Sequence, residues 1–225
     1  MLETFASAAA LADCAAAGIA AGLEAALAAR GRASLVVTGG RAPGPVYDRL
    51  AQMALDWPRI MVTLSDERCV AADAPESNER LVRARLLRGA AAQAEFIQLY
   101  GAGDPEPRLR GRLPFDVVML GMGEDGHVAS LLPGMPGLAA AMDPQGAALV
   151  RAVPAGWGSP PLARITLTLA ALLAARTILI LIAGDAKRRA VAAALEGADL
   201  PVRALLVQDR VPVRVLWTAN HDNGR

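Results

Sequence analysis

A glycine-rich segment leads into one of only two histidines in the chain. Gly121, Gly123 and Gly126 fall within six residues, and Asp125 lies two residues before His127. Glycines let a loop approach a ligand closely, and an imidazole exchanges a proton near neutral pH. A lone histidine is more often a hydrogen-bonded structural residue, but the glycines and the nearby carboxylate favour a functional one. We therefore expect His127 to transfer a proton at a ligand site.

A second candidate segment places two carboxylates and a guanidinium next to one another at Asp66, Glu67 and Arg68. Either carboxylate could act as an acid or base, and the arginine could bind a phosphate. A solvated charged turn would explain the same residues, and a helix cap would explain Ser77 a little further along. This segment alone leaves these interpretations open.

A third candidate segment is the glycine pair Gly39 and Gly40, which ends a short apolar run and precedes Arg41. Glycine amides followed by the positive end of a helix suit an anion such as phosphate, and Arg41 could add a charge-assisted contact. An ordinary glycine turn is equally compatible. The third glycine of a dinucleotide-binding fingerprint is absent at the required spacing, which disfavours a dehydrogenase of that type.

The three segments each follow an apolar run that is typical of a buried strand. Strands are expected at 34–38, 59–64, 96–99, 115–120, 164–169, 177–182, 204–207 and 213–217. Helices are expected at 11–27, 46–53, 77–87 and 186–195. This alternation predicts one α/β domain over residues 1–225, with a doubly wound, mostly parallel sheet, helices on both faces and a mobile tail from about residue 219. Parallel strands end at one edge of such a sheet, so we expect the three segments to converge on one pocket.

Composition excludes several other classes of protein. Hydrophobic residues make up 54% of the chain, which excludes disordered and collagen-like proteins. The formal charge is only +1, without a long basic run, so we expect no nucleic-acid partner. No Lys or Arg precedes Arg30, and the every-fourth spacing from Leu11 to Leu27 predicts a core helix rather than a signal peptide or membrane anchor. Cys14 and Cys69 show neither disulfide-framework nor zinc-ligand spacing, so we expect a cytoplasmic protein.

Five segments taken together resemble the 6-phosphogluconolactonase family, whose superfamily also contains glucosamine-6-phosphate deaminases. They occur in the family's order and are Thr38-Gly-Gly-Arg-Ala-Pro43, Asp66-Glu-Arg-Cys-Val70 with Ser77-Asn78, Leu120-Gly-Met-Gly-Glu-Asp-Gly-His-Val-Ala-Ser-Leu-Leu-Pro133, Arg164-Ile-Thr-Leu-Thr168 and Gly184-Asp-Ala-Lys187. The glycine–histidine segment is highly specific. In the deaminases it resembles Gly-Ile-Gly-x-Asn-Gly-His with an Asn-Glu-Pro ending, whereas this chain has Asp125 and then Ala129-Ser130-Leu131. The lactonase branch is therefore the closer match.

The resemblance implies hydrolysis of 6-phosphoglucono-δ-lactone to 6-phosphogluconate, in the oxidative pentose phosphate route, without a metal or other cofactor. It implies that His127 is the base and that Asp66 or Asp125 orients it. The residues implied to bind the phosphate are Gly39, Gly40, Arg41, Arg68, Arg164 and Lys187. The family usually has hydroxyl residues where this chain has Arg41-Ala42, and typically Lys where it has Ser159. We therefore expect Arg41 to replace a hydroxyl contact.

Two other functions remain open at this stage. One is a sugar-phosphate isomerase or deaminase on the same scaffold, in which Asp66 would abstract a proton from carbon. The other is a non-catalytic sugar-phosphate sensor, because a fold does not fix a function. In each case the expected partner is a small sugar phosphate, bound to a monomer or a small homo-oligomer, with no membrane partner.

Overall fold

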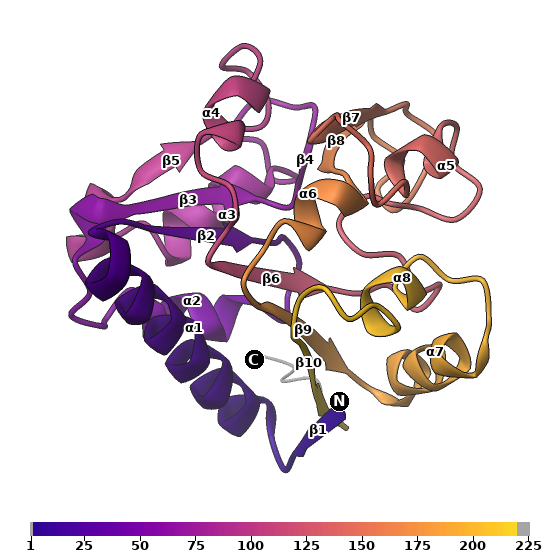
Figure 1. The fold of residues 1–225 in the computed structure, drawn as a ribbon, viewed down its shortest axis with the longest axis horizontal. Coiled ribbons are helices and arrows are strands. Elements are labelled where there is room, and N and C mark those ends of the chain that lie inside the picture. Colours follow the sequence, from indigo (N-terminus) through magenta and orange to yellow (C-terminus); the bar gives the residue numbers. More distant parts are fainter. Residues whose placement is uncertain (1, 220–225) are drawn as a thin grey trace.

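A seven-stranded sheet in which every neighbouring pair of strands is parallel forms the centre of the molecule. The computed structural model describes residues 2–219, so most of the expected mobile tail lies outside the described residues. In spatial order the strands are β1 (Leu2–Phe5), β10 (Val213–Thr218), β9 (Ile178–Ala183), β6 (Val117–Gly121), β2 (Ala33–Val37), β3 (Ile60–Leu64) and β5 (Glu95–Ile97), as Figure 1 shows. The predicted α/β class with a mostly parallel sheet is confirmed.

The direction of winding reverses between β2 and β6. From β2 the chain proceeds through β3 to β5 at one edge, whereas from β6 it proceeds through β9 to β10 toward the other edge. Loops that leave neighbouring strands at such a switch point diverge to opposite faces, so a crevice opens between them. The loops after β2 and β6 contain the two predicted glycine segments.

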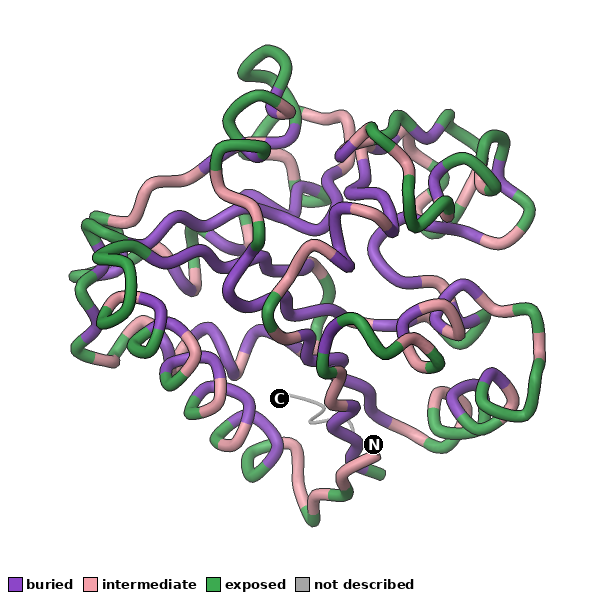
Figure 2. The backbone as a smooth tube through the Cα atoms, in the orientation of Figure 1, coloured by how far each residue is buried: buried purple, intermediate pink, exposed green. Residues whose placement is uncertain are grey.

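Helices cover both faces of this sheet (Figure 1). The helices α1 and α2 pack together on one side, and α6 and α8 lie on the other. The helices are α1 (Ala8–Arg30), α2 (Gly44–Leu50), α3 (Asn78–Arg85), α4 (Glu106–Arg110), α5 (Leu138–Ala141), α6 (Leu169–Leu173), α7 (Asp185–Glu196) and α8 (Arg203–Leu206), with short 3₁₀ helices at Trp57–Arg59 and Gly89–Gln93. Two-sided cover explains why β2, β3 and β9 are buried along their whole length (Figure 2).

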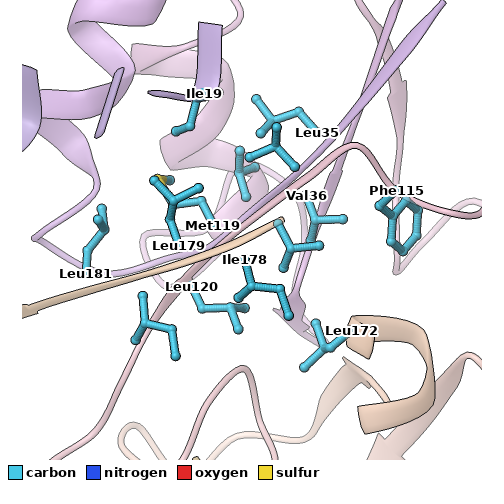
Figure 3. Close-up of a cluster of buried hydrophobic side chains, with 14 of the residues drawn as sticks. Ile19, Leu35, Val36, Phe115, Met119, Leu120, Leu172, Ile178, Leu179 and Leu181 are labelled. Carbon is cyan, nitrogen blue, oxygen red and sulfur yellow. The ribbon is translucent and has the colours of Figure 1, made fainter. Parts of the chain in front are cut away.

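The first helix, α1, is long and apolar enough to cross a membrane by length and composition alone. Its buried residues include Leu11, Ala15, Ile19 and Leu23, which follow the predicted every-fourth spacing. This stripe packs against the sheet, and Figure 3 shows Ile19 pointing toward the same cluster as Leu35 of β2. The predicted core helix is confirmed by that burial.

A second, three-stranded antiparallel sheet stands beside the first. It consists of β4 (Asp66–Arg68), β8 (Arg164–Leu167) and β7 (Val150–Val153) in the order β4-β8-β7. The strand expected at 164–169 therefore exists, but outside the parallel sheet. Local alternation predicts an extended backbone and cannot identify the strand that will pair with it.

One predicted strand is wrong. Residues 204–207 lie in and just after the helical turn α8, where the Leu206 and Val207 amides donate to the carbonyls of Val202 and Arg203. A four-residue apolar run is too short to distinguish a strand from a buried helical turn. The strands β1, β4 and β7 and the helices α4, α5 and α6 were not expected from the sequence.

Candidate active site

The loops at the switch point border a cleft of about 280 Å³. Those after β2 and β6 meet there with β4, β8, the start of α7 and the loop around Ser159. Among the residues lining it are Gly39, Gly40, Arg41, Asp66, Arg68, His127, Arg164 and Lys187. The structure thus gathers eight of the nine predicted site residues in one cleft, and the ninth, Asp125, contacts His127.

The imidazole of His127 is paired with Asp125. The Nδ1 atom of His127 lies 2.6 Å from Oδ1 of Asp125, and the backbone amide of His127 donates to the same oxygen at 3.3 Å. Because a carboxylate accepts, this geometry suits a proton on Nδ1 and leaves Nε2 as the nitrogen that can take a proton. Of the two carboxylates left open by the sequence, Asp125 is the one that contacts the imidazole.

The loop reaches this geometry because residue 123 has no side chain. A Cβ atom on Gly123 would lie 2.2 Å from Nδ1 of His127 and 2.4 Å from Oδ1 of Asp125. Gly126 adds a positive φ of 75°, which glycine adopts without strain. Of the glycines noticed in the sequence, Gly123 therefore makes room for the Asp125–His127 pair, and Gly126 supplies the turn between them.

Asp66 belongs to a different, buried network. Its Oδ2 accepts a hydrogen bond of 2.6 Å from Ser130, its Oδ1 accepts one of 3.1 Å from Ser65, and Nη1 of Arg164 lies 3.8 Å from Oδ2. Ser130 is fully buried, and its amide donates to Thr166 of β8. Asp66 and Ser130 thus link the loop after β6 to the second sheet and hold Arg164 at the cleft.

Glu67 is a structural residue rather than an acid or base of the cleft. Its carboxylate accepts from the backbone amides of Arg68, Asn78 and Glu79 and from the hydroxyl of Ser77. Burial raises the pKa of Glu67, and these hydrogen bonds act in the opposite direction. Glu67 fixes the start of α3 beside β4, while Ser77 caps that helix as expected.

Three cations line the cleft with incomplete partners or altered pKa values. Among the described residues, the buried Nε atoms of Arg68 and Arg164 have no hydrogen-bond partner. Burial lowers the pKa of Arg164, and Arg68 acts in the same direction, while Asp66 opposes it. Burial also lowers the pKa of Lys187, with Arg41 acting in the same direction and Glu124 and Asp125 opposing. Crowded cations with unused donors are suited to an anionic ligand.

The glycine pair after β2 has a structural cause as well as a place in the cleft. A Cβ atom on Gly39 would lie 1.8 Å from Oδ1 of Asn78, so only glycine fits there. Asn78 donates from Nδ2 to the carbonyl oxygen of Asp66 at 2.8 Å and lines the cleft. Asn78 and Ser130 are site residues to which the sequence analysis gave no role, although both lie inside the motifs it singled out.

The chain is similar in sequence to a known protein family over nearly its whole length. A family model described as "Glucosamine-6-phosphate isomerases/6-phosphogluconolactonase" matches residues 6–217. The chain belongs to this family. Within residues 2–219, no three His, Cys, Asp or Glu side chains form a group that could hold a metal ion.

Named members of the family support its lactonase branch. A 6-phosphogluconolactonase of Caulobacter vibrioides is 44% identical over 96% of each chain, and one of Pseudomonas aeruginosa is 44% identical over 96% of this chain and 94% of the relative. The crystal structure of a 6-phosphogluconolactonase from Shewanella baltica superimposes with a TM-score of 0.90 at 38% identity, covering 97% of both chains. The family resemblance expected from the five segments is confirmed.

Proposed function

We propose that this protein is a 6-phosphogluconolactonase, which hydrolyses 6-phosphoglucono-δ-lactone to 6-phosphogluconate. The observation that carries the proposal is the presence of His127, paired with Asp125, in the same cleft as Arg68, Arg164 and Lys187. In this proposal His127 is the proton acceptor, and the two arginines and the lysine supply positive charge for a phosphate. The named relatives, similar over nearly the whole chain, support the same substrate.

In the proposed reaction, His127 activates a water molecule. Nε2 takes a proton from the water as its oxygen attacks the lactone carbonyl carbon, and the carbonyl oxygen becomes an oxyanion. The bond from that carbon to the ring oxygen then breaks, and the imidazolium returns its proton to the departing oxygen. Asp125 holds the ring and faces the positive charge that forms on it. No covalent enzyme intermediate is required, because a lactone is activated enough for direct attack by water.

The phosphate group of the substrate is proposed to lie among Arg68, Arg164 and Lys187, beside the amides of Gly39 and Gly40. Binding energy gained at the phosphate positions the reacting carbon at the other end of the substrate. Arg41 is proposed to add a contact where other members carry a hydroxyl group. Asp66 is proposed to hold Arg164 in position for the phosphate. Its oxygens are already hydrogen-bonded to Ser65 and Ser130 and do not contact His127.

The proposal includes a metal-independent reaction in the oxidative pentose phosphate route, in the cytoplasm, with a sugar phosphate as the substrate. Monomer and small homo-oligomer are both compatible with it. Hydrolysis of freshly generated lactone, measured in a coupled assay with and without a chelator, tests the metal-independent step. Loss of activity on adding the chelator would contradict it.

Replacing the proposed base tests the mechanism directly. His127→Ala is expected to lower kcat by about 10²–10⁴-fold, the usual contribution of a general base, while 6-phosphogluconate still binds. Because the lactone also hydrolyses unaided, the rate of the blank is subtracted. Undiminished enzymatic turnover in His127→Ala would remove His127 from the role of base.

The two alternative functions give different results in the same experiments. A deaminase would release ammonia from glucosamine 6-phosphate, and a sensor would bind sugar phosphates without accelerating lactone opening. We expect neither result. Ammonia release that depends on Asp66 would instead support the isomerase or deaminase interpretation.

A further inference from the structure

A second cavity lies at the end of the parallel sheet away from the cleft, where β2, β6 and β9 begin. Its volume is about 50 Å³. Four arginines line it: Arg30 at the end of α1, Arg32 just before β2, Arg112 in the segment before β6, and Arg176 just before β9. We call this group of four the arginine pocket. It is separated from the cleft by the length of β2, about 15 Å for five residues at the rise of a strand.

A buried carboxylate organises the arginine pocket. Asp116 accepts hydrogen bonds from the amide of Ser34 at 2.8 Å and its hydroxyl at 3.1 Å. It also pairs with Arg30, and with Nε of Arg176 at 3.3 Å. These contacts hold two guanidinium groups from distant parts of the chain on one carboxylate, which brings α1 and the start of β9 together.

The arginine pocket carries more positive charge than its carboxylates can neutralise. Arg112 pairs with Glu95, but Glu95 also pairs with Arg108 outside the pocket. Among the described residues, Asp116 is the only carboxylate that lines the cavity. Even with Glu95 counted as the partner of Arg112, the four arginines exceed their carboxylates by two positive charges. Within residues 2–219, the side chain of Arg32 makes no hydrogen bond or ion pair. Like charges repel when gathered around one cavity, and a bound anion would relieve that repulsion.

We propose that the arginine pocket binds a phosphoryl group, or a comparable multiply charged oxyanion, at a site separate from the cleft. Guanidinium groups bind such oxyanions through paired, charge-assisted hydrogen bonds. The cavity of about 50 Å³ is far smaller than the cleft of about 280 Å³, so it suits a small tetrahedral anion better than a sugar ring. Arg30, Arg32 and Arg176 are exposed, so the remainder of a phosphorylated ligand would extend into solvent.

Backbone amide signals in an NMR titration with inorganic phosphate can separate the two sites. The signals of Ser34 and Asp116 report on the arginine pocket, and those of Gly40 and Gly123 report on the cleft. We expect saturable shifts of Ser34 and Asp116 that do not require the cleft to be occupied. Shifts confined to Gly40 and Gly123, or no saturable shift at Ser34 and Asp116, would overturn the proposal.

Charge-removing variants test whether the arginines themselves bind the anion. Arg32→Gln combined with Arg176→Gln is expected to weaken phosphate binding at the pocket by at least about tenfold, the effect of losing one charge-assisted hydrogen bond. Arg59→Gln is the matched control, because Arg59 precedes β3 at the same edge of the sheet but does not line the cavity. Equal weakening in Arg59→Gln would show general charge screening and overturn the proposal. If the double variant does not fold, Arg32→Gln alone serves, because Arg32 has no partner to lose.

A second titration with ADP distinguishes a phosphorylated small molecule from free phosphate as the ligand of the arginine pocket. Tighter binding than inorganic phosphate at Ser34 and Asp116 would indicate a phosphorylated small molecule whose remainder also contacts the protein. Equal affinity would indicate recognition of the phosphate alone. Neither titration measures catalysis, so failure of this proposal would leave the lactonase proposal intact, and failure of the lactonase proposal would leave this one intact.

Discussion

Asp125 contacts Nδ1 of His127 and leaves Nε2 for the proposed proton transfer. A carboxylate 2.6 Å from Nδ1 favours a proton on that nitrogen and restrains the orientation of the ring. Asp66 lies in the same cleft but is occupied by Ser65, Ser130 and Arg164. The two carboxylates therefore differ in position rather than in chemistry, because Asp125 contacts His127 and Asp66 contacts Ser130 and Arg164.

Replacing Arg68 is expected to separate substrate binding from chemistry. Arg68→Ala should chiefly raise KM for the lactone, by about tenfold or more, because a charge-assisted contact to the phosphate is lost in the ground and transition states alike. Steady-state kinetics on freshly generated lactone measure this. The exposed Arg151, on β7 outside the cleft, provides a matched control as Arg151→Ala. A fall in kcat at unchanged KM would contradict the assignment of Arg68 to the phosphate.

Binding of the product is expected to weaken with rising pH because of Lys187. Burial lowers the pKa of Lys187, so its ammonium group is lost at a lower pH than that of an ordinary lysine. Affinity for 6-phosphogluconate should therefore fall as the pH rises through that lowered pKa. Lys187→Arg keeps its charge throughout this range and should move the fall to higher pH. Calorimetric titrations at several pH values measure the effect, and identical profiles for the two proteins would count against it.

At the scale of elements, the cleft depends on two sheets meeting. The parallel sheet contributes the loops after β2 and β6, and the antiparallel sheet contributes β4 and β8. The register of β4 against β8 pairs Arg68 with Arg164, which places two like charges side by side. Asp66 pairs with Thr166 in the same register. Because Asp66 and Arg68 are two residues apart on one strand, the carboxylate lies on the same face as the arginine.

The tight loop after β6 is expected to tolerate no side chain at residue 123. Gly123→Ala would place a Cβ atom 2.2 Å from Nδ1 of His127 and force the ring to move. A displacement of about 1 Å at a reacting group costs about 10²-fold in rate, so kcat should fall by that order. Activity and thermal denaturation should be measured together.

The matched control for this loop is Gly111→Ala. A Cβ atom on Gly111 would meet its nearest neighbour at 3.6 Å, an ordinary contact, and Gly111 lies outside the cleft. We expect it to keep full activity. Wild-type kcat in Gly123→Ala would show that the loop adapts, and would contradict the close packing of residue 123 against the imidazole.

At the scale of the whole molecule, one hydrophobic core supports the site. The core cluster extends from α1 through the central strands to α6 and α8, and Figure 3 shows part of it around Leu35, Met119 and Ile178. The strands that end at the cleft are therefore buried on both faces. Their ends are held in place by packing along the whole strand.

Removing part of this core is expected to destabilise the molecule. Leu35 is fully buried in β2, so Leu35→Ala should lower the free energy of unfolding by about 2–5 kcal/mol. Leu195, with 56% of its surface exposed, provides the control, and Leu195→Ala should change it by less than about 0.5 kcal/mol. Urea denaturation followed by circular dichroism measures both. Equal effects for the two variants would mean that β2 is not part of the stabilising core.

The sequence alone predicted most strands of the parallel sheet, the longer helices and the main segments that form the cleft. Runs such as Ile178–Ala183 are apolar throughout because both faces of the strand are covered, and this pattern can be read from the sequence. The Gly121–His127 segment was conspicuous because three glycines and a carboxylate precede one of the two histidines in the chain. Local patterns of this kind record the burial and backbone freedom of each residue.

Tertiary structure decided which residues are partners. Asp125 rather than Asp66 contacts His127, the strand at 164–167 joins a second sheet, and residues 204–207 form a helical turn and its end instead of a strand. Ser130 and Asn78 acquire their roles from hydrogen bonds to Asp66, which lies 64 residues from Ser130 and 12 from Asn78. The arginine pocket, too, combines residues that lie far apart along the chain. Contacts of this kind depend on which segments pack together, and no local pattern of residues encodes that choice.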